Sequence, residues 1–327
     1  MKQKTLSTIG EFGIIDIIAS RFKKIAEKNI AASLGDDAFS FIAGKEIISI
    51  TKDMLIEDIH FKKDWISPFD LGKKSIEVNI SDLAAMGGAQ PKYIFIGFGA
   101  PSDTEIVWIK EFASGIFAAC NKYGAKICGG DTVRADKITI SITALGISEK
   151  IIKRSGAKDG DLIGITNFCG NSAAGLDLLS KYGAKYHFNR DEKNLIKKHN
   201  QPIARLKEGA VISDFANSMT DSSDGLFVSI SLLADASKKG AEIFIDKIPI
   251  SPQLKRTVAD KDKMLSYLLF GGEDFELAFT LREKKAEILK KLLPQISFIG
   301  RIKSKKGITF KEYGKKIKID GAAFKHF

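Results

Sequence analysis

Carboxylates that follow apolar segments and sit beside small residues constrain this chain more than any other feature of its sequence. The stretch LGDDAF (34–39) places Asp36 and Asp37 side by side, directly after a glycine. Alone, this stretch is explained most simply as a solvated turn, because Gly and Asp are common turn formers. Acidic residues in the same kind of setting recur in both halves of the chain, at Asp53, Asp82, Asp131, Asp221, Asp224 and the pair Glu273 and Asp274.

Such a set of oxygen donors is typical of a site for a hard cation. The donors come without the His or Cys pairs of a zinc site, so Mg²⁺ is favoured over Zn²⁺. Carboxylates that converge in a folded chain repel one another unless a divalent ion neutralises them. Taken singly, each residue has a structural explanation, such as a turn for Asp131 or a helix N-terminus for Asp224. Together they predict a magnesium site that draws on both halves of the chain.

Two glycine loops accompany these acids, GGD at 129–131 and GGED at 271–274. Glycines allow the backbone to approach a ligand closely and to direct N–H groups toward phosphate oxygens. The sequence contains no P-loop motif G-x-x-x-x-G-K-[ST]. The fragment GFGAPS (97–102) lacks the third glycine of a dinucleotide-binding loop, and Pro101 interrupts it. A P-loop nucleotide enzyme and a Rossmann dehydrogenase are therefore both disfavoured.

Composition bounds the class of protein. A chain of 327 residues, 44% hydrophobic and 28% charged, is long enough for two globular domains. It has no apolar run that could cross a bilayer, no signal-peptide features and no C-x-x-C pair, so we expect a reduced, cytoplasmic protein without a membrane partner. The net charge of +11 comes from scattered lysines without interleaved aromatic residues, which argues against a nucleic-acid partner.

Apolar periodicity predicts that strands and helices alternate in both halves, which indicates a mixed α/β (α+β) fold. A turn-rich segment at 153–166 sets the domain boundary near 148–155, giving domains of residues 1–150 and 151–327. In the first half we expect helices at 10–28, 69–88 and 104–122 and strands at 46–55, 92–100, 125–132 and 137–148. In the second half we expect an apolar strand after the turn-rich segment, helices from 171, through 190–212, at 225–239 and at 283–293, strands at 241–246 and 274–281, and short strands near the C-terminus.

A series of motifs runs along the chain from about Gly10 to Phe327: GEFGII, LGDDAF, TKDMLIEDIHF, SDLAAMGG, GGDT, RSGAKDGD, NSAAGL, TDSSDGL and GGEDFEL. In this order they resemble the thiamine-monophosphate kinase family, a branch of the aminoimidazole ribonucleotide synthetase-like superfamily. The resemblance implies an N-terminal domain that binds ATP and Mg²⁺ and pairs its sheet across a homodimer. It also implies a C-terminal mixed-sheet α+β domain that closes the active-site cleft.

The activity that this resemblance implies is Mg²⁺-assisted phosphorylation of thiamine monophosphate by ATP, which yields thiamine diphosphate by direct in-line transfer. Phosphoryl transfer depends on positioning and charge neutralisation more than on bond-making side chains. The nucleophile would be a phosphate oxygen that is already anionic, so no catalytic general base is expected. Several Mg²⁺ ions would hold the two mutually repelling phosphates in line.

The resemblance also implies a role for particular residues, each taken from a matching motif. The implied metal ligands are Asp36, Asp37, Thr51, Asp53, Asp82, Asp131, Asp221 and Asp224. The implied ATP contacts are Lys52, Gly129, Gly130, Asp131, Arg154 and Ser223. The implied contacts to thiamine monophosphate are His60, Glu273 and Phe324.

Three positions depart from the family pattern. Lys52 replaces a small hydroxyl residue, which alters one metal site if that side chain takes part. Ala113 stands where many relatives carry a tyrosine near the nucleotide, so stacking on the base would be weaker. Phe324 replaces a tryptophan or tyrosine and can still stack on a cationic thiazolium ring, though less strongly than tryptophan.

Alternative functions are separated by other sequence features. Selenophosphate synthetase needs a reactive cysteine near the N-terminus, and none precedes Cys120. The hydrogenase-maturation relative ends in a modifiable cysteine, whereas this chain ends in Phe327. Aminoimidazole ribonucleotide synthetase fits the architecture, but SDLAAMGG and the tail FKHF argue against it. A non-catalytic protein that binds Ca²⁺ or senses nucleotide could use the same carboxylates, and an assay of ATP turnover separates it from the enzyme.

Overall fold

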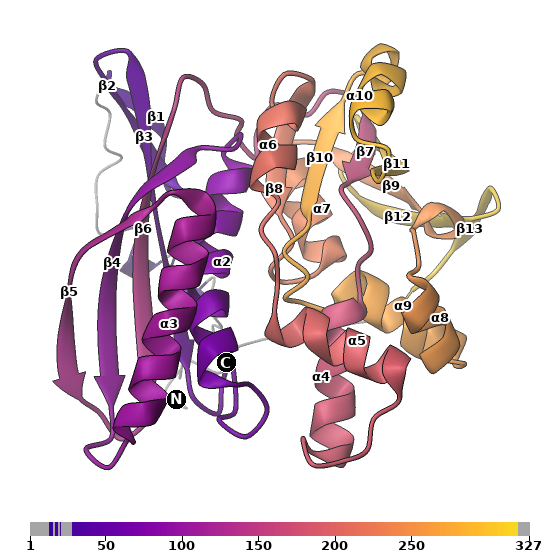
Figure 1. The fold of residues 1–327 in the computed structure, drawn as a ribbon. Coiled ribbons are helices and arrows are strands. Elements are labelled where there is room, and N and C mark those ends of the chain that lie inside the picture. Colours follow the sequence, from indigo (N-terminus) through magenta and orange to yellow (C-terminus); the bar gives the residue numbers. More distant parts are fainter. Residues whose placement is uncertain (1–12, 16, 19, 21–27, 320–327) are drawn as a thin grey trace, which may run out of the picture.

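The structure, a computed structural model, describes residues 13–15, 17–18, 20 and 28–319. Its two sheets, one in each half of the chain, are accompanied by helices (Figure 1). The helix expected at 10–28 falls largely outside the described residues, and Phe324 lies outside them. Among the described helices, none is both long enough and apolar enough to cross a membrane.

The N-terminal sheet has the strand order β1-β2-β3-β6-β4-β5, in which only β4 and β5 pair in parallel. The strands are β1 (Ile30–Ala32), β2 (Phe39–Ala43), β3 (Glu46–Ile56), β4 (Gln90–Ala100), β5 (Lys126–Arg134) and β6 (Thr139–Ser148). Along β6 every second side chain is buried, including Ile140, Ile142 and Ala144, as the alternating sequence predicts. Helices α2 (Pro68–Ala85) and α3 (Ile106–Tyr123) lie on this buried face, between the sheet and the C-terminal half (Figure 1).

Helix α2 begins and ends where its sequence indicates. The Ser67 hydroxyl accepts a hydrogen bond from the backbone N–H of Asp70 at 3.1 Å, and Pro68 takes the first helical position, where no N–H is needed. Ile76, Ile80 and Leu83 are fully buried, and each contributes about 1.5–3 kcal/mol of hydrophobic free energy. The helix expected at 69–88 is therefore confirmed.

The C-terminal sheet has the order β13-β12-β9-β11-β7-β10-β8, in which only β9 and β12 are parallel. Its strands are β7 (Leu162–Ile165), β8 (Ala216–Asp221), β9 (Gly240–Phe244), β10 (Leu277–Leu281), β11 (Ser297–Lys303), β12 (Gly307–Glu312) and β13 (Lys315–Ile317). The helices are α4 (Asn171–Tyr182), α5 (Arg190–Asn200), α6 (Leu206–Ile212), α7 (Leu226–Ala236), α8 (Pro252–Thr257), α9 (Lys261–Phe270) and α10 (Ala286–Leu292). Two single turns of 3₁₀ helix, Ile245–Lys247 and Glu283–Lys285, complete this half.

The strand expected at 274–281 is wrong at its beginning. Strand β10 starts only at Leu277, because Glu273 (φ 63°) and Phe275 (φ 51°) have left-handed backbone conformations that a strand cannot contain. The expected strand at 241–246 likewise ends at Phe244, where the 3₁₀ turn begins. Helices α8 and α9 and strands β1, β2 and β8 were not predicted.

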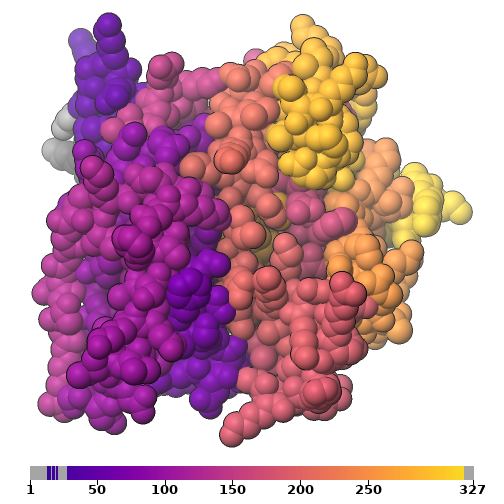
Figure 2. Space-filling view, in the orientation of Figure 1, coloured from indigo at the N-terminus to yellow at the C-terminus, as the bar shows by residue number. Residues whose placement is uncertain are grey.

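The two halves share an apolar core. Leu83 and Ile142 of the N-terminal half pack in one buried cluster with Met219 and Phe279 of the C-terminal half. Figure 2 shows the halves lying against each other along the face in view. Burial of this continuous apolar surface fixes the relative placement of the halves.

Glycines let α2 and α3 pack with their backbones in close approach. A Cβ atom on Gly115 of α3 would lie 1.9 Å from the carbonyl oxygen of Phe69, and one on Gly72 of α2 would lie 2.2 Å from that of Phe112. Both neighbours are backbone atoms, so a side chain could be accommodated only if one helix moved.

We expect Gly115→Ala to lower the free energy of unfolding by about 1–3 kcal/mol, because overpacking outweighs the better helix propensity of alanine. Ser114→Ala is the matched control, since Ser114 is the exposed neighbour on the same helix. It should change stability by less than about 0.5 kcal/mol. Chemical denaturation of both variants measures the difference, and equal stabilities would contradict the close helix contact.

Candidate metal centre

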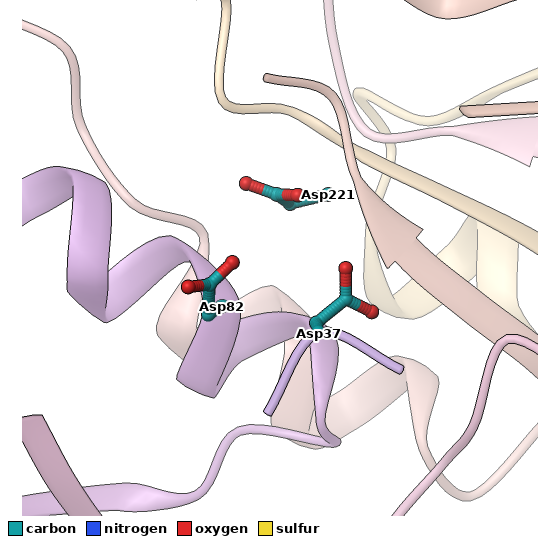
Figure 3. A group of neighbouring side chains, drawn as sticks. All are labelled: Asp37, Asp82 and Asp221. Carbon is teal, nitrogen blue, oxygen red and sulfur yellow. The ribbon is translucent and has the colours of Figure 1, made fainter. Parts of the chain in front are cut away.

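Three carboxylates from distant segments converge at the junction of the two halves. Asp37 lies in the loop between β1 and β2, Asp82 in the last turn of α2, and Asp221 at the end of β8. Each offers one oxygen atom, and these atoms lie within 4.8 Å of one another. Figure 3 shows the three side chains pointing into a common space.

The adjacent acids Asp36 and Asp37 have different partners. Asp36 accepts a hydrogen bond from the backbone N–H of Arg154 at 2.8 Å. Asp37 Oδ1 accepts from the Arg154 guanidinium, 2.6 Å from Nη2, and from the Thr220 hydroxyl at 2.8 Å. One carboxylate therefore ties the loop to the segment after β6, while the other enters the cluster.

The second oxygen of Asp37 marks where a cation fits. Asp37 Oδ2 is buried and has no hydrogen-bond partner among the described residues. Burial raises the pKa of Asp37 even though Arg154 and Thr220 oppose the rise. An unpaired, buried carboxylate oxygen is costly unless a cation completes its coordination. Because the donors are all oxygens, the residues fit a hard divalent cation such as Mg²⁺.

Burial and mutual repulsion make the cluster hard to ionise in the absence of a cation. Burial raises the pKa of Asp82 well above its ordinary value, and Asp53, Asp221 and Asp37 raise it further. The pKa of Asp221 rises to about 8, mainly through burial and the charge of Asp37. Hydroxyl groups orient both carboxylates, since Thr51 donates to Asp82 and Ser81 donates to Asp221 at 2.7 Å.

Asp53 and Asp224 extend the acidic cluster. Burial and the nearby charge of Asp224 raise the pKa of Asp53 to about 6. The backbone N–H of Asp53 donates to Asn79 Oδ1 at 3.2 Å, which fixes β3 against α2. The structure thus brings together six of the predicted ligands: Asp37, Thr51, Asp53, Asp82, Asp221 and Asp224.

Asp131 and Lys52 lie on the other face of the N-terminal sheet. Asp131 is in register across the strands with Gly97, Ser141 and Met54, and Met54 is the residue after Asp53. Because neighbouring residues on a strand point to opposite faces, Asp131 faces away from the cluster, and two strands separate β5 from β3. Lys52 shares this outer face, where its Nζ lies 3.4 Å from Thr143 Oγ1. A single chain does not bring these two residues to the cluster.

The remaining candidate residues lie in three different places. His60 Nδ1 accepts from the backbone N–H of Ile56 at 3.0 Å in the turn after β3. The Ser223 carbonyl accepts from the N–H of Glu273 at 2.6 Å. Gly129 and Gly130 lie on the exposed strand β5 beside Asp131.

Asp274 has a structural role. Its carboxylate accepts hydrogen bonds from the backbone N–H groups of Gly170 and Ser172, at 2.5 and 3.0 Å, and so caps the beginning of α4. Burial nevertheless raises its pKa to about 7.

Sequence analysis missed Asn79 and Thr220, which hold the cluster in place, and Lys74, which pairs with Glu273. A signal for Lys74 was available, because it lies three residues after Leu71 and four before Val78 on α2, within the buried stripe of the helix. Asn79 and Thr220 gave no such signal, since their role depends on contacts between distant segments.

The sequence matches two known domain families in succession. Residues 35–148 match the family "AIR synthase related protein, N-terminal domain", and residues 162–312 match "AIR synthase related protein, C-terminal domain". Together with the two sheets and the acidic cluster between them, these matches define a two-domain protein of the AIR synthase related class.

Similar proteins narrow this class to one family. Thiamine-monophosphate kinase of Buchnera aphidicola subsp. Acyrthosiphon pisum is 39% identical over 95% of this chain and 98% of its own length. Thiamine-monophosphate kinase of Aquifex aeolicus is 34% identical, with coverages of 98% and 99%. The solved complex of AaThiL with AMPPCP and TMP has a TM-score of 0.88 and 32% identity over 100% of both chains. The chain belongs to the thiamine-monophosphate kinase family.

The raised pKa values predict how pH affects stability without divalent cations. The pKa of Asp221 in the folded chain is about 8, whereas the pKa of an unperturbed aspartate is 3.8. The folded state therefore binds more protons than the unfolded state between these values, and stability falls as pH rises through this window. Asp221→Asn should raise the Tm in EDTA at pH 8 and flatten its pH dependence.

Calorimetry between pH 5 and 8, with EDTA or with Mg²⁺, measures this effect. Mg²⁺ should raise the Tm of the wild-type chain most at pH 8, where the carboxylates it binds are least protonated. Asp235→Asn, a change at an exposed aspartate of α7, should behave like the wild type. An Asp221→Asn variant that is destabilised in EDTA would contradict the repulsive cluster.

Proposed function

We propose that this protein phosphorylates thiamine monophosphate with ATP and Mg²⁺ to give thiamine diphosphate and ADP. The observation that carries the proposal is the cluster of Asp37, Asp82 and Asp221, whose buried and unpaired oxygen calls for a cation. Its support from relatives is the family membership and the similarity to AaThiL in complex with AMPPCP and TMP.

The residues that would hold Mg²⁺ are Asp37, Thr51, Asp53, Asp82, Asp221 and Asp224, together with Asp36 beside them. When bound, the metal would supply positive charge that lets the phosphates of donor and acceptor approach each other. The chain would orient the two substrates and exclude water from them. No general base is needed, because the acceptor phosphate is already anionic.

Arg154 is proposed as a contact to the ATP phosphates, together with Lys52, Gly129, Gly130 and Ser223. Its guanidinium is fixed at the edge of the cluster by Asp37, and its side chain is 20% exposed. A planar guanidinium fork can bond a carboxylate and a phosphate at the same time. Arg154 would thereby join the nucleotide to the metal ligands.

We also propose that the protein is a homodimer that pairs the outer faces of its N-terminal sheets. This face exposes apolar side chains, with Met54 and Tyr93 each 46% and Phe95 42% exposed. Exposed apolar patches of this kind mark protein interfaces. Asp131 shares this face, so a second copy would place Asp131 of each protomer at the interface, and we propose that it acts there on the site of the other protomer.

His60, Glu273 and Phe324 are proposed to contact thiamine monophosphate. We further propose a cytoplasmic location, where ATP is available. It agrees with three cysteines, Cys120, Cys128 and Cys169, that are unpaired thiols in the structure.

Incubation of the purified protein with ATP, Mg²⁺ and thiamine monophosphate tests the activity, with thiamine diphosphate measured by chromatography. Omission of Mg²⁺ should abolish the product. Binding of ATP without turnover would instead indicate a nucleotide-binding protein. Formation of ADP with an aminoimidazole ribonucleotide precursor, but not with thiamine monophosphate, would indicate a synthetase of the same superfamily.

Asp82→Asn should reduce kcat by about a hundredfold or more, because it removes a carboxylate at the centre of the cluster. Folding should be retained, since the substitution also removes a repulsive charge. Circular dichroism and steady-state kinetics measure the two effects. Normal activity of this variant at low Mg²⁺ would refute the assignment of the cluster as the metal site.

Mixing two inactive variants tests whether Asp131 acts across a dimer. Asp82→Asn and Asp131→Asn should each be inactive alone. Random re-association makes half of the dimers mixed, and each mixed dimer has one intact site, so about a quarter of wild-type activity should return. If Asp131 serves its own chain, the mixture stays inactive.

A further inference from the structure

Lys74 is a buried charge that the metal cluster does not use. It lies on α2 with its side chain only 1% exposed, and it is among the largest fully buried side chains of the described chain. Its ammonium group lies 3.1 Å from Glu273 Oε2. The pair joins the N-terminal half to the C-terminal half.

Stability alone does not account for this pair. Removing two charges from water costs several kcal/mol per ion, and buried ion pairs can often be replaced by apolar residues without loss of stability. Buried positions one turn to either side of Lys74 on α2, Leu71 and Val78, are apolar, so an apolar side chain would suit this part of the helix.

Glu273 is held by two further contacts, one through its backbone and one through its side chain. Its backbone has φ of 63°, a conformation uncommon for residues other than glycine, and its N–H donates to the carbonyl of Ser223 at 2.6 Å. His199 of α5, 4% exposed, places its Nδ1 3.1 Å from the same Oε2 that meets Lys74. The Ser172 hydroxyl of α4 contacts His199 Nδ1 at 3.1 Å and so fixes the ring.

The two carboxylate oxygens of Glu273 therefore have different surroundings. Oε2 contacts both Lys74 and His199, whereas Oε1 accepts no hydrogen bond from the described part of the chain. The side chain as a whole is 25% exposed, so Glu273 reaches solvent beside the junction. Burial by itself raises the pKa of Glu273, but Lys74 and His199 outweigh it and hold the pKa well below its usual range. Glu273 therefore stays ionised and can only accept hydrogen bonds.

We propose that Lys74 and His199 are positioning residues that orient Glu273, so that its Oε1 accepts a hydrogen bond from the amino group on the pyrimidine ring of thiamine monophosphate. This inference rests on the proposed function and adds two residues to the substrate site. Binding of the acceptor would then depend on Lys74, which lies on the same helix as Asp82. ATP binding would not depend on Lys74.

Lys74→Met tests the proposal, because methionine is unbranched and apolar and can occupy the buried position without charge. Calorimetric titration with thiamine monophosphate, in the presence of Mg²⁺ and AMPPCP, should show a Kd raised about tenfold to a hundredfold. The Kd of AMPPCP itself should stay within about twofold of the wild type.

Glu77→Gln is the matched control. Glu77 also lies on α2, is 1% exposed, and accepts a hydrogen bond across the junction from the backbone N–H of Ala204 at 2.8 Å, but it does not contact Glu273. If Lys74 only joins the two halves, the two variants should weaken both ligands alike, and the proposal is overturned. It is equally overturned if Lys74→Met binds thiamine monophosphate as the wild type does.

A double variant covers the case in which Lys74→Met leaves Glu273 unpaired and fails to fold. Lys74→Met combined with Glu273→Gln removes both charges, and it should bind thiamine monophosphate as weakly as Glu273→Gln alone, because Lys74 acts through Glu273. A further loss in the double variant would overturn the proposal. A wild-type chain that neither binds nor phosphorylates thiamine monophosphate would instead overturn the proposed function, and this inference with it.

Discussion

Repulsion among the buried carboxylates Asp37, Asp82 and Asp221 is the constraint on which the rest of the structure depends. Carboxylates this close separate unless the surrounding structure restrains them, and here each comes from a different element. Arg154 and Thr220 hold the first, Thr51 the second and Ser81 the third. The folding free energy of the apolar core holds together acidic side chains that would otherwise separate.

Helix α2 makes this arrangement possible because it serves both halves at once. Its apolar side chains pack against the N-terminal sheet, while its polar ones reach across the junction. Lys74 meets Glu273, Glu77 meets the backbone of Ala204, and Ser81 meets Asp221. The proposed metal site and the proposed acceptor site therefore lie along one rigid element, and their separation is set by the rise of a helix.

Local patterns in the sequence were enough to predict the elements, and the family resemblance was enough to predict the residues of the cluster. The strands at 46–55 and 137–148 followed from periodicity, because each buries one face along its length. The helix at 69–88 followed from the acid near its start and the glycines after its end. The bend at Glu273 could not be predicted in this way, because left-handed backbone conformations at residues other than glycine leave no local signal in the sequence. The outward direction of Asp131 could not be deduced either, because it depends on the register of four strands. The spacing of Lys74 from Leu71 and Val78 indicated a buried position on the helix, but its place in a pair of lysines suggested a solvated surface.

The shared core also limits how ligands can enter and leave. Leu83, Met219 and Phe279 belong to one buried cluster, and Gly209 of α6 sits so close to α2 that a Cβ atom there would lie 2.3 Å from the carbonyl oxygen of Ala84. A hinge motion that separated the two halves would expose this shared apolar core to water. We therefore expect substrates to enter and products to leave through movement of loops. The two halves should stay packed against each other throughout each catalytic cycle.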